Sequence, residues 1–184
     1  MTTLYERRIE QEWEILLLLV KANPSVLQSS NRESEANLTI FSFVLLQTQS
    51  LSGRPNDLRI KDHYNVRLQF PKFFPSTPIE ASLTQPVFHP NVHPETGFVC
   101  LWNRFSPGDT VMEAVSQLQR VIAWELVNEE TDHLMQPEAL VWYKDPARGM
   151  ELPLPYQPIT KPIDFQKERT YAIRPPNSFR RRLE

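Results

Sequence analysis

A histidine, an asparagine and a cysteine lie close together in this chain of 184 residues. His89, Pro90 and Asn91 are consecutive, and Cys100, the only cysteine in the sequence, follows nine positions later. Together they offer a nucleophile, an amide donor and a rigid turn. Prolines and Gly97 among apolar neighbours indicate a structured loop. A thiol held on such a loop can serve as a reaction centre.

The chemistry open to Cys100 depends on its surroundings. An ordinary cysteine has a pKa of about 8.5, so only a few per cent is thiolate at neutral pH. A catalytic thiol therefore needs local activation or a very reactive electrophile, such as a thioester. The alternative is a structural role, because Val99 and Leu101 are apolar and cysteine is often a small buried hydrophobe.

Two further kinds of site would use the nearby histidines. A cysteine hydrolase needs a histidine base and a residue that orients it, and the available residues are His89, His93, Asn91 and Asp109. A zinc site would take His89, His93, Cys100 and His133. No recognised protease motif surrounds the cysteine, and Pro90 and Pro94 oppose the helix on which i,i+4 histidines bind zinc.

The elements that must position these residues begin with an N-terminal helix. Thr3 and Glu6 have the spacing of a capping box, and Asn23-Pro24 should end the helix. Helical periodicity predicts an apolar face. Its members are Ile9, Trp13, Leu16, Leu17 and Val20.

An antiparallel meander of three to four strands should follow. β-branched and aromatic residues predict strands over 38–46, 64–70 and 79–83, with a weaker signal over 26–30. Residues 47–62 carry serine, glycine, proline and asparagine, which predicts a long connection between neighbouring strands.

Helices dominate the chain after the cysteine loop. Turn residues over 106–110 precede a long central helix over 111–126, and a short helix is expected over 137–143. These elements predict an α+β domain over residues 1–145, with helices on one side of the sheet. Residues 146–184 form a proline-rich C-terminal extension, which we expect to be extended and partly irregular.

Composition limits the partners. The net charge of -2 gives no electrostatic reason to expect nucleic acid. The longest apolar run, residues 15–20, falls far short of the roughly 20 residues that cross a membrane. A single cysteine and the lack of a signal pattern before the first helix predict a cytoplasmic location. No phosphate-binding loop is visible, and no cofactor is expected.

Several linked motifs resemble the ubiquitin-conjugating enzymes in content and order. They are Phe70-Pro71-Lys72-Phe73-Phe74-Pro75-Ser76-Thr77-Pro78, Phe88-His89-Pro90-Asn91, Gly97-Phe98-Val99-Cys100-Leu101 and Phe105-Ser106-Pro107. The similarity covers approximately residues 3–145, and the predicted order of helices and strands agrees with that family's fold.

This resemblance implies a role for each residue of the loop. Cys100 would accept a ubiquitin-like protein from an activating enzyme as a thioester, which an amine of a protein substrate then attacks. Asn91 matches the family asparagine whose amide stabilises the oxyanion or holds the loop. His89 and Pro90 would brace the loop. The rivals are a noncatalytic scaffold of the same fold that binds ubiquitin-like proteins, and the cysteine hydrolase.

An acidic residue is also implied by the resemblance. Asp132 falls near the position where many members orient the incoming lysine with a carboxylate, and Glu129 or Glu130 would replace it if the alignment slips. Its alternative role is a helix N-cap or a solvated loop acid.

Departures from the family pattern concern the partners. Ser76 stands where many members present an aromatic for ligase docking, so the use of a typical RING ligase is in question. The residues expected at docking surfaces are Arg7, Arg8, Phe73, Phe74 and Pro107. These departures and the proline-rich tail would suit a compact bacterial ubiquitin-like modification pathway, one used in phage defence.

Overall fold

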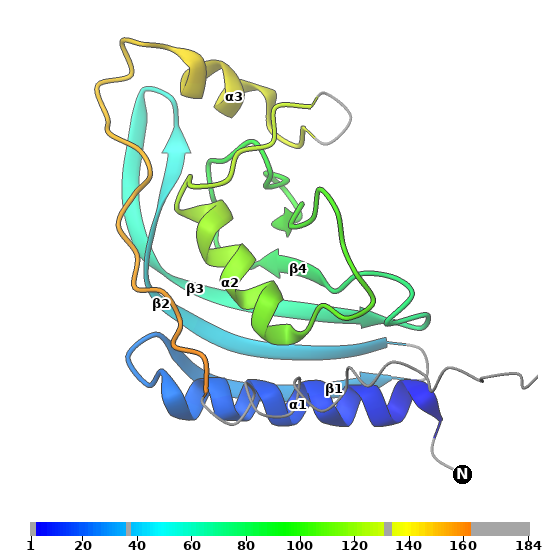
Figure 1. Cartoon of the computed structure of the whole chain (residues 1–184). Coiled ribbons are helices and arrows are strands. Elements are labelled where there is room, and N and C mark those ends of the chain that lie inside the picture. The colour runs from blue at the N-terminus through cyan, green and yellow to red at the C-terminus, as the bar shows by residue number, and fades with distance from the viewer. Residues whose placement is uncertain (1–2, 36–37, 131–133, 163–184) are drawn as a thin grey trace, which may run out of the picture.

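The computed structural model describes residues 3–35, 38–130 and 134–162 (Figure 1). Five antiparallel strands lie in the order β1-β2-β3-β4-β5. The elements are α1 (Leu4–Ala22), β1 (Leu27–Glu35), β2 (Leu38–Arg54), β3 (Asp57–Pro71), β4 (Glu80–Leu83), β5 (Phe98–Val99), α2 (Val111–Ile122) and α3 (Pro137–Lys144). The predicted α+β class and the order of elements are confirmed. β5 was not predicted, because a strand of two residues has no periodicity to detect.

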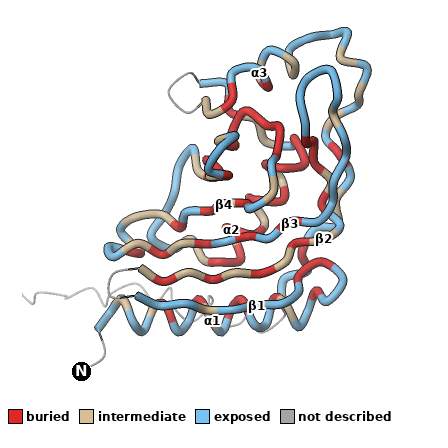
Figure 2. Tube along the Cα trace, turned by 180° about the vertical axis from the view of Figure 1, so that it is seen from behind, coloured by how far each residue is buried: buried red, intermediate tan, exposed pale blue. Residues whose placement is uncertain are grey.

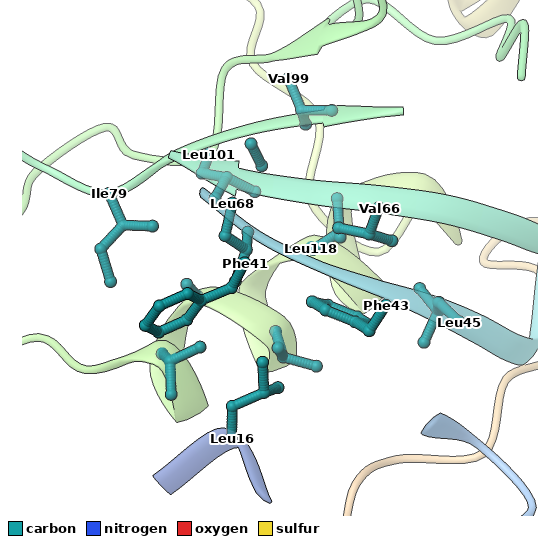
Figure 3. Close-up of a cluster of buried hydrophobic side chains, with 14 of the residues drawn as sticks. Leu16, Phe41, Phe43, Leu45, Val66, Leu68, Ile79, Val99, Leu101 and Leu118 are labelled. Carbon is teal, nitrogen blue, oxygen red and sulfur yellow. The ribbon is translucent and has the colours of Figure 1, made fainter. Parts of the chain in front are cut away.

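The main core lies between the sheet and the helices α1 and α2. β2 and β3 pair so that Phe41 faces Leu68 and Phe43 faces Val66, and all four side chains are buried. Leu16 of α1 and Leu118 of α2 meet these residues (Figure 3). β1 is largely exposed, whereas buried residues gather around α2 and the inner strands (Figure 2).

α1 begins as predicted, and its buried face includes Ile9 and Leu16 as expected but differs from the prediction at Leu17 and Glu12. Thr3 and Glu6 form both hydrogen bonds of a capping box, and Asn23 is the C-cap. Leu17, expected in the core, is 43% exposed. The buried positions are Ile9, Glu12, Ile15, Leu16 and Leu19. The buried face is therefore turned toward Glu12, because that carboxylate has a partner in α2.

Glu12 joins the two helices. Its Oε2 accepts a hydrogen bond from the backbone N–H of Val111, the first residue of α2, at 2.6 Å, and Arg8 lies 2.8 Å from its Oε1. Glu12 is fully buried. Desolvation outweighs both partners and raises the pKa of Glu12 from 4.5 to about 7. The folded protein therefore favours the neutral acid.

Glu12→Gln should change how stability depends on pH. Between pH 4.5 and 7 the unfolded chain ionises Glu12 while the folded chain keeps it neutral, so wild-type stability falls with rising pH, and the loss is complete above pH 7. A glutamine stays neutral and can still accept from Val111. In denaturant unfolding, the difference in unfolding free energy between the variant and wild type should shift by about 3 kcal/mol in favour of the variant from pH 4.5 to pH 8. An unchanged difference between the two proteins would contradict this.

The prediction of a long connection over 47–62 is wrong, because this segment consists of the end of β2, a tight turn and the start of β3. β2 and β3 continue through it as one long hairpin, and Arg54 pairs with Asp57 across a two-residue turn (Figure 1). A register shift between Leu46 and Ser50 bends β2 at this point. The polar residues that suggested a loop are partly buried, since Thr48 and Ser50 are inaccessible to solvent. A second apolar cluster, built around Leu51, Phe88, Trp124, Ala139 and Leu154, lies beneath the hairpin.

The described part of the C-terminal extension lies against the domain. Residues 146–162 contain no helix or strand, but Tyr156 forms a β-bridge with Thr48. Gln49 donates its backbone N–H to Pro155 O, and Gln157 donates to Gln47 O. β1 pairs with β2 only as far as Leu45, so the extension covers the edge of β2 beyond that point. This segment is called the strap below.

None of the helices in the described residues combines the length and the apolar character that a membrane crossing would require.

Candidate active site

The histidine loop is held by hydrogen bonds to distant residues. Nδ1 of His89 accepts the backbone N–H of Asn91 at 3.0 Å, and the backbone N–H of His89 donates to Oε1 of Gln136 at 2.8 Å. Met135 donates to Pro90 O at 2.9 Å. Complete burial lowers the pKa of His89 from 6.5 to about 3, so the ring is neutral. The neutral ring accepts a hydrogen bond at Nδ1, which agrees with the loop-supporting role that the resemblance implies for His89.

Gly97 brings the second half of the loop onto β4. Its φ is +68°, in the left-handed region, and a Cβ here would collide with the carbonyl oxygen of Leu83. Leu83 also donates its backbone N–H to Gly97 O at 2.9 Å. Only glycine allows this approach, which sets the entry into β5 and so the position of Cys100.

Asn91 ties three segments together through one buried side chain. Its Nδ2 donates to Cys100 O at 3.1 Å, and its Oδ1 accepts the backbone N–H of Asn128 at 2.9 Å. The backbone N–H of Cys100 donates to Asn91 O at 2.8 Å. These bonds define which end of the amide faces the cysteine. In this arrangement the side chain holds the loop.

Cys100 follows β5 between two core residues. Val99 and Leu101 lie in the main cluster on either side of it (Figure 3), and the indole N–H of Trp102 donates to Ile79 O at 2.8 Å. Cys100 itself is 8% exposed. Burial raises the pKa of its thiol above the ordinary value. Burial therefore disfavours the thiolate, and a reaction at this thiol would need an activated electrophile.

The rate at which Cys100 is alkylated should report this raised pKa. Only the thiolate reacts, so the rate with iodoacetamide should keep rising with pH beyond the pH at which the cysteine of a short peptide, blocked at both ends, reaches its plateau. Mass spectrometry of the intact protein gives the rate, because no other cysteine competes. A plateau at lower pH than the reference thiol would contradict the prediction.

The hydrolase and zinc sites gain no support from the geometry. His89 is neutral and uses Nδ1 on the backbone, while Nδ1 of His93 accepts the N–H groups of Glu95 and Thr96. Within the described ranges, no group of three or more metal-binding side chains comes together. His133, one of the zinc ligands considered, lies outside the described residues.

A small pocket lies beside the cysteine loop. Its volume is about 170 Å³, and it is lined by Asn91, Leu101, Asn103, Arg104, Gln117, Val121, Leu126, Val127 and Asn128. Gln117 donates to Leu101 O at 3.1 Å and so supports the residue after Cys100. The pocket is therefore formed by α2, the segment after α2 and the segment after the cysteine.

The acidic candidates are only partly described. Asp132 lies outside the described residues. Glu129 forms an ion pair with Lys144 of α3 at 2.8 Å, and each side chain is 54% exposed. Glu130 is exposed and donates its backbone N–H to Oδ1 of Asn128 at 3.0 Å. Glu129 and Glu130 thus lie directly after the residue that Asn91 holds.

The residues expected at docking surfaces divide into two groups. Arg7, Pro107 and Phe73 are exposed, Phe73 by 66%. Arg8 lies over the ring of Phe74 and against Glu12, and Phe74 is 5% exposed. The expectation for Phe74 is therefore wrong, because its ring packs edge-on against Phe70 in the core. The guanidinium of Arg8 contacts Glu12 and the ring of Phe74 within the protein.

Two residues that support the site were not predicted. Asn128 and Gln136 lie between the two helices predicted after the cysteine loop, where the sequence indicates no site residue, yet both are buried and bond to the histidine loop. Their partners lie 37 and 47 positions away in the chain. No local pattern signals such pairs. The proline after Gln136 was read only as a helix start.

Comparisons with known proteins agree with this geometry. A family model described as "Ubiquitin-conjugating enzyme" matches residues 8–145. The SUMO-conjugating enzyme UBC9 of Caenorhabditis elegans is 40% identical to the chain over 52 residues, which cover 28% of this chain and 31% of that protein.

Two solved structures share the fold. One is a protein provisionally named ubiquitin conjugating enzyme from Plasmodium yoelii, with a TM-score of 0.51 and 18% identity, covering 76% of this chain and 84% of that one. The other, from Trypanosoma cruzi and named in the same provisional way, has a TM-score of 0.51 and 20% identity, covering 77% and 91%.

Proposed function

The chain belongs to the ubiquitin-conjugating enzyme family, and we propose that it carries a ubiquitin-like protein as a thioester on Cys100 and transfers it to a target amine. The observation that carries this proposal is the pair of bonds between Asn91 and Cys100, one through the asparagine side chain and one through its backbone. They hold the only thiol of the chain in one loop geometry, inside the segment that the family model matches.

Loading would be a thiol exchange. The thiolate of Cys100 attacks the thioester carbonyl that joins the ubiquitin-like protein to its activating enzyme. A new C–S bond forms, the old C–S bond breaks, and the activating enzyme regains its thiol. The raised pKa of Cys100 limits the thiolate fraction, and the reactivity of the thioester compensates. ATP would be used by the activating enzyme.

Transfer would follow by attack of an amine on the same carbonyl. The neutral nitrogen adds to the carbon, an oxyanion forms, and the C–S bond then breaks to leave an amide and the thiol of Cys100. The amine loses one proton overall. We assign Asn91 to positioning, since its Nδ2 already donates to Cys100 O. His89 and Pro90 brace the loop from the other side.

The residue that receives the amine's proton stays a prediction. Asp132 is the first candidate by position, and Glu129 is the second, since it follows Asn128 and lies at the surface. A protein substrate with a lysine is the expected acceptor. Exposed Arg7, Phe73 and Pro107 are candidates for contacts with an activating enzyme or a ligase. A cytoplasmic location and a bacterial defence pathway also stay predictions.

One experiment tests the proposal. The protein is incubated with ATP and matched sets of an activating enzyme and its ubiquitin-like protein, with ubiquitin and SUMO sets among them because of the family and the UBC9 match. We expect an adduct of higher mass with one set, which a reducing thiol removes. If no set gives an adduct but a ubiquitin-like protein binds non-covalently, the result would favour the noncatalytic scaffold. Release of the free ubiquitin-like protein from a peptide fusion would favour the hydrolase.

A further inference from the structure

Six buried side-chain atoms have no hydrogen-bond partner among the described residues, and two of them, in Arg8 and Glu12, belong to one ion pair, which leaves four without a partner. The atoms are Nε2 of His89, Nε1 of Trp124, Nδ2 of Asn128 and Oγ1 of Thr77. Buried polar atoms are normally paired, so each exception needs an explanation. Of these four residues, only Asn128 lines the pocket beside the cysteine loop. It is 4% exposed.

Hydrogen bonds define the orientation of the Asn128 amide. Its Oδ1 accepts the backbone N–H of Glu130 at 3.0 Å, so Nδ2 occupies the other end of the amide. Its backbone N–H donates to Oδ1 of Asn91. The residue is therefore held in place by two bonds that do not use its NH₂ group. Neither N–H donor of that group has a partner among the described residues, and Nδ2 is itself buried although Asn128 lines the pocket.

Asn91 places Asn128 close to the cysteine. One end of the Asn91 amide lies 2.9 Å from Asn128 N, and the other end lies 3.1 Å from Cys100 O. Leu101, the residue after Cys100, lines the same pocket as Asn128. Cys100 is not among the residues that line this pocket, so a carbonyl group attached to the thiol would have to extend past Leu101 to meet the amide of Asn128. The pocket, at about 170 Å³, holds several times the volume of a water molecule, which is roughly 30 Å³.

We infer that Asn128 is a catalytic residue of this chain, and that its Nδ2 donates to the carbonyl oxygen of the thioester and to the oxyanion that forms when an amine attacks. This inference rests on the proposed function. A donor that is preorganised in a buried site stabilises developing charge without reorganising during the reaction. Asn91 and Asn128 thus divide the work, the first holding the loop and the second contacting the reacting oxygen.

Single-turnover discharge of the loaded protein tests this inference. Wild type, Asn128→Ala and Asn128→Asp are loaded to completion, the activating enzyme is stopped, and release to free lysine and to hydroxylamine is followed at pH 8. Removing one oxyanion donor typically costs about a hundredfold in rate or more, so both variants should discharge about a hundredfold more slowly. The factor should be the same for both amines, because the donor acts on the carbonyl.

Two comparisons separate chemistry from structure. Asn128→Asp keeps the acceptor for Glu130 but lacks the donor, so a normal rate in this variant with a slow Asn128→Ala would overturn the inference in favour of a loop role. Asn31→Ala is the matched control, because Asn31 is an exposed asparagine of β1 that does not line this pocket, and the rate of the variant should stay within about threefold of wild type.

The remaining outcomes are also decisive. A defect confined to lysine would show that Asn128 acts on the nucleophile, which overturns the inference. Equal discharge rates of wild type and both variants would also overturn the inference, but they would leave the proposed function intact. If wild type cannot be loaded at all, the proposed function fails first, and the assignment of Asn128 fails with it.

Discussion

Cys100→Ala should abolish the thiol-sensitive adduct, with a loss of loading on the order of a thousandfold or more. The reason is that the chain has no second cysteine, so no other thiol can form the thioester. The substitution removes one sulfur atom from a site that is 8% exposed, and the fold should tolerate it. Gel analysis with and without reducing agent measures the adduct.

Cys100→Ser provides the matched variant. A serine keeps the size of the side chain and replaces the thiol by a hydroxyl, so an adduct formed on it would be an oxygen ester. We expect that ester to form slowly, to resist reducing thiols and to be cleaved by hydroxide. An adduct that survives in Cys100→Ala, or one on wild type that resists a thiol, would place the reaction on a different residue.

Gln119→Leu should cost about 3–5 kcal/mol of unfolding free energy. Nε2 of Gln119 donates to Thr48 Oγ1 at 3.0 Å and to Gln157 O at 2.8 Å, while its Oε1 accepts the backbone N–H of Ile159 at 3.1 Å. The side chain is 1% exposed and joins α2, β2 and the strap. A leucine of similar size would leave several buried polar groups unpaired, each at a cost of about 1–3 kcal/mol.

The neighbouring position supplies a control for this stability change. Arg120→Gln removes the ion pair with Glu125, whose side chains are 39% and 34% exposed, and exposed pairs contribute about 0–1 kcal/mol. Denaturant unfolding compares the two variants. Hydrogen exchange at the Ile159 amide should accelerate only in Gln119→Leu. Equal stability of the two variants, with Ile159 still protected, would contradict a role for Gln119 in holding the strap.

Helix starts could be predicted from the sequence because their signals are local, whereas α2 ends at Ile122, four residues before the predicted end at Leu126. Thr3 with Glu6 forms the expected capping box, and α2 begins after Thr110, within the turn predicted over 106–110. The buried face of α1 could not be predicted to the same accuracy. Leu17 satisfies the apolar pattern but stays exposed, and Glu12 breaks the pattern but is buried against the first turn of α2.

The long hairpin shows a second limit of local reasoning. Residues 47–62 have the composition of a loop, and yet they pair as strands as far as Arg54 and Asp57. Their polar side chains are satisfied by other elements. Thr48 accepts from Gln119, and Ser50 shares a hydrogen bond with Tyr64. A buried serine or threonine costs little when such a partner exists, but the partner is invisible in a sequence window.

The sequence alone indicated the family, the single thiol as a candidate and the order of the elements apart from β5, since these depend on residue types and short spacings. Only the tertiary structure shows which partners the two asparagines have. Asn91 was a candidate both for the oxyanion and for the loop, and its two partners define its orientation. Asn128 became a candidate only when folding brought it to Asn91 from 37 positions away. Hydrogen bonds between such distant residues form through packing, which local periodicity does not encode.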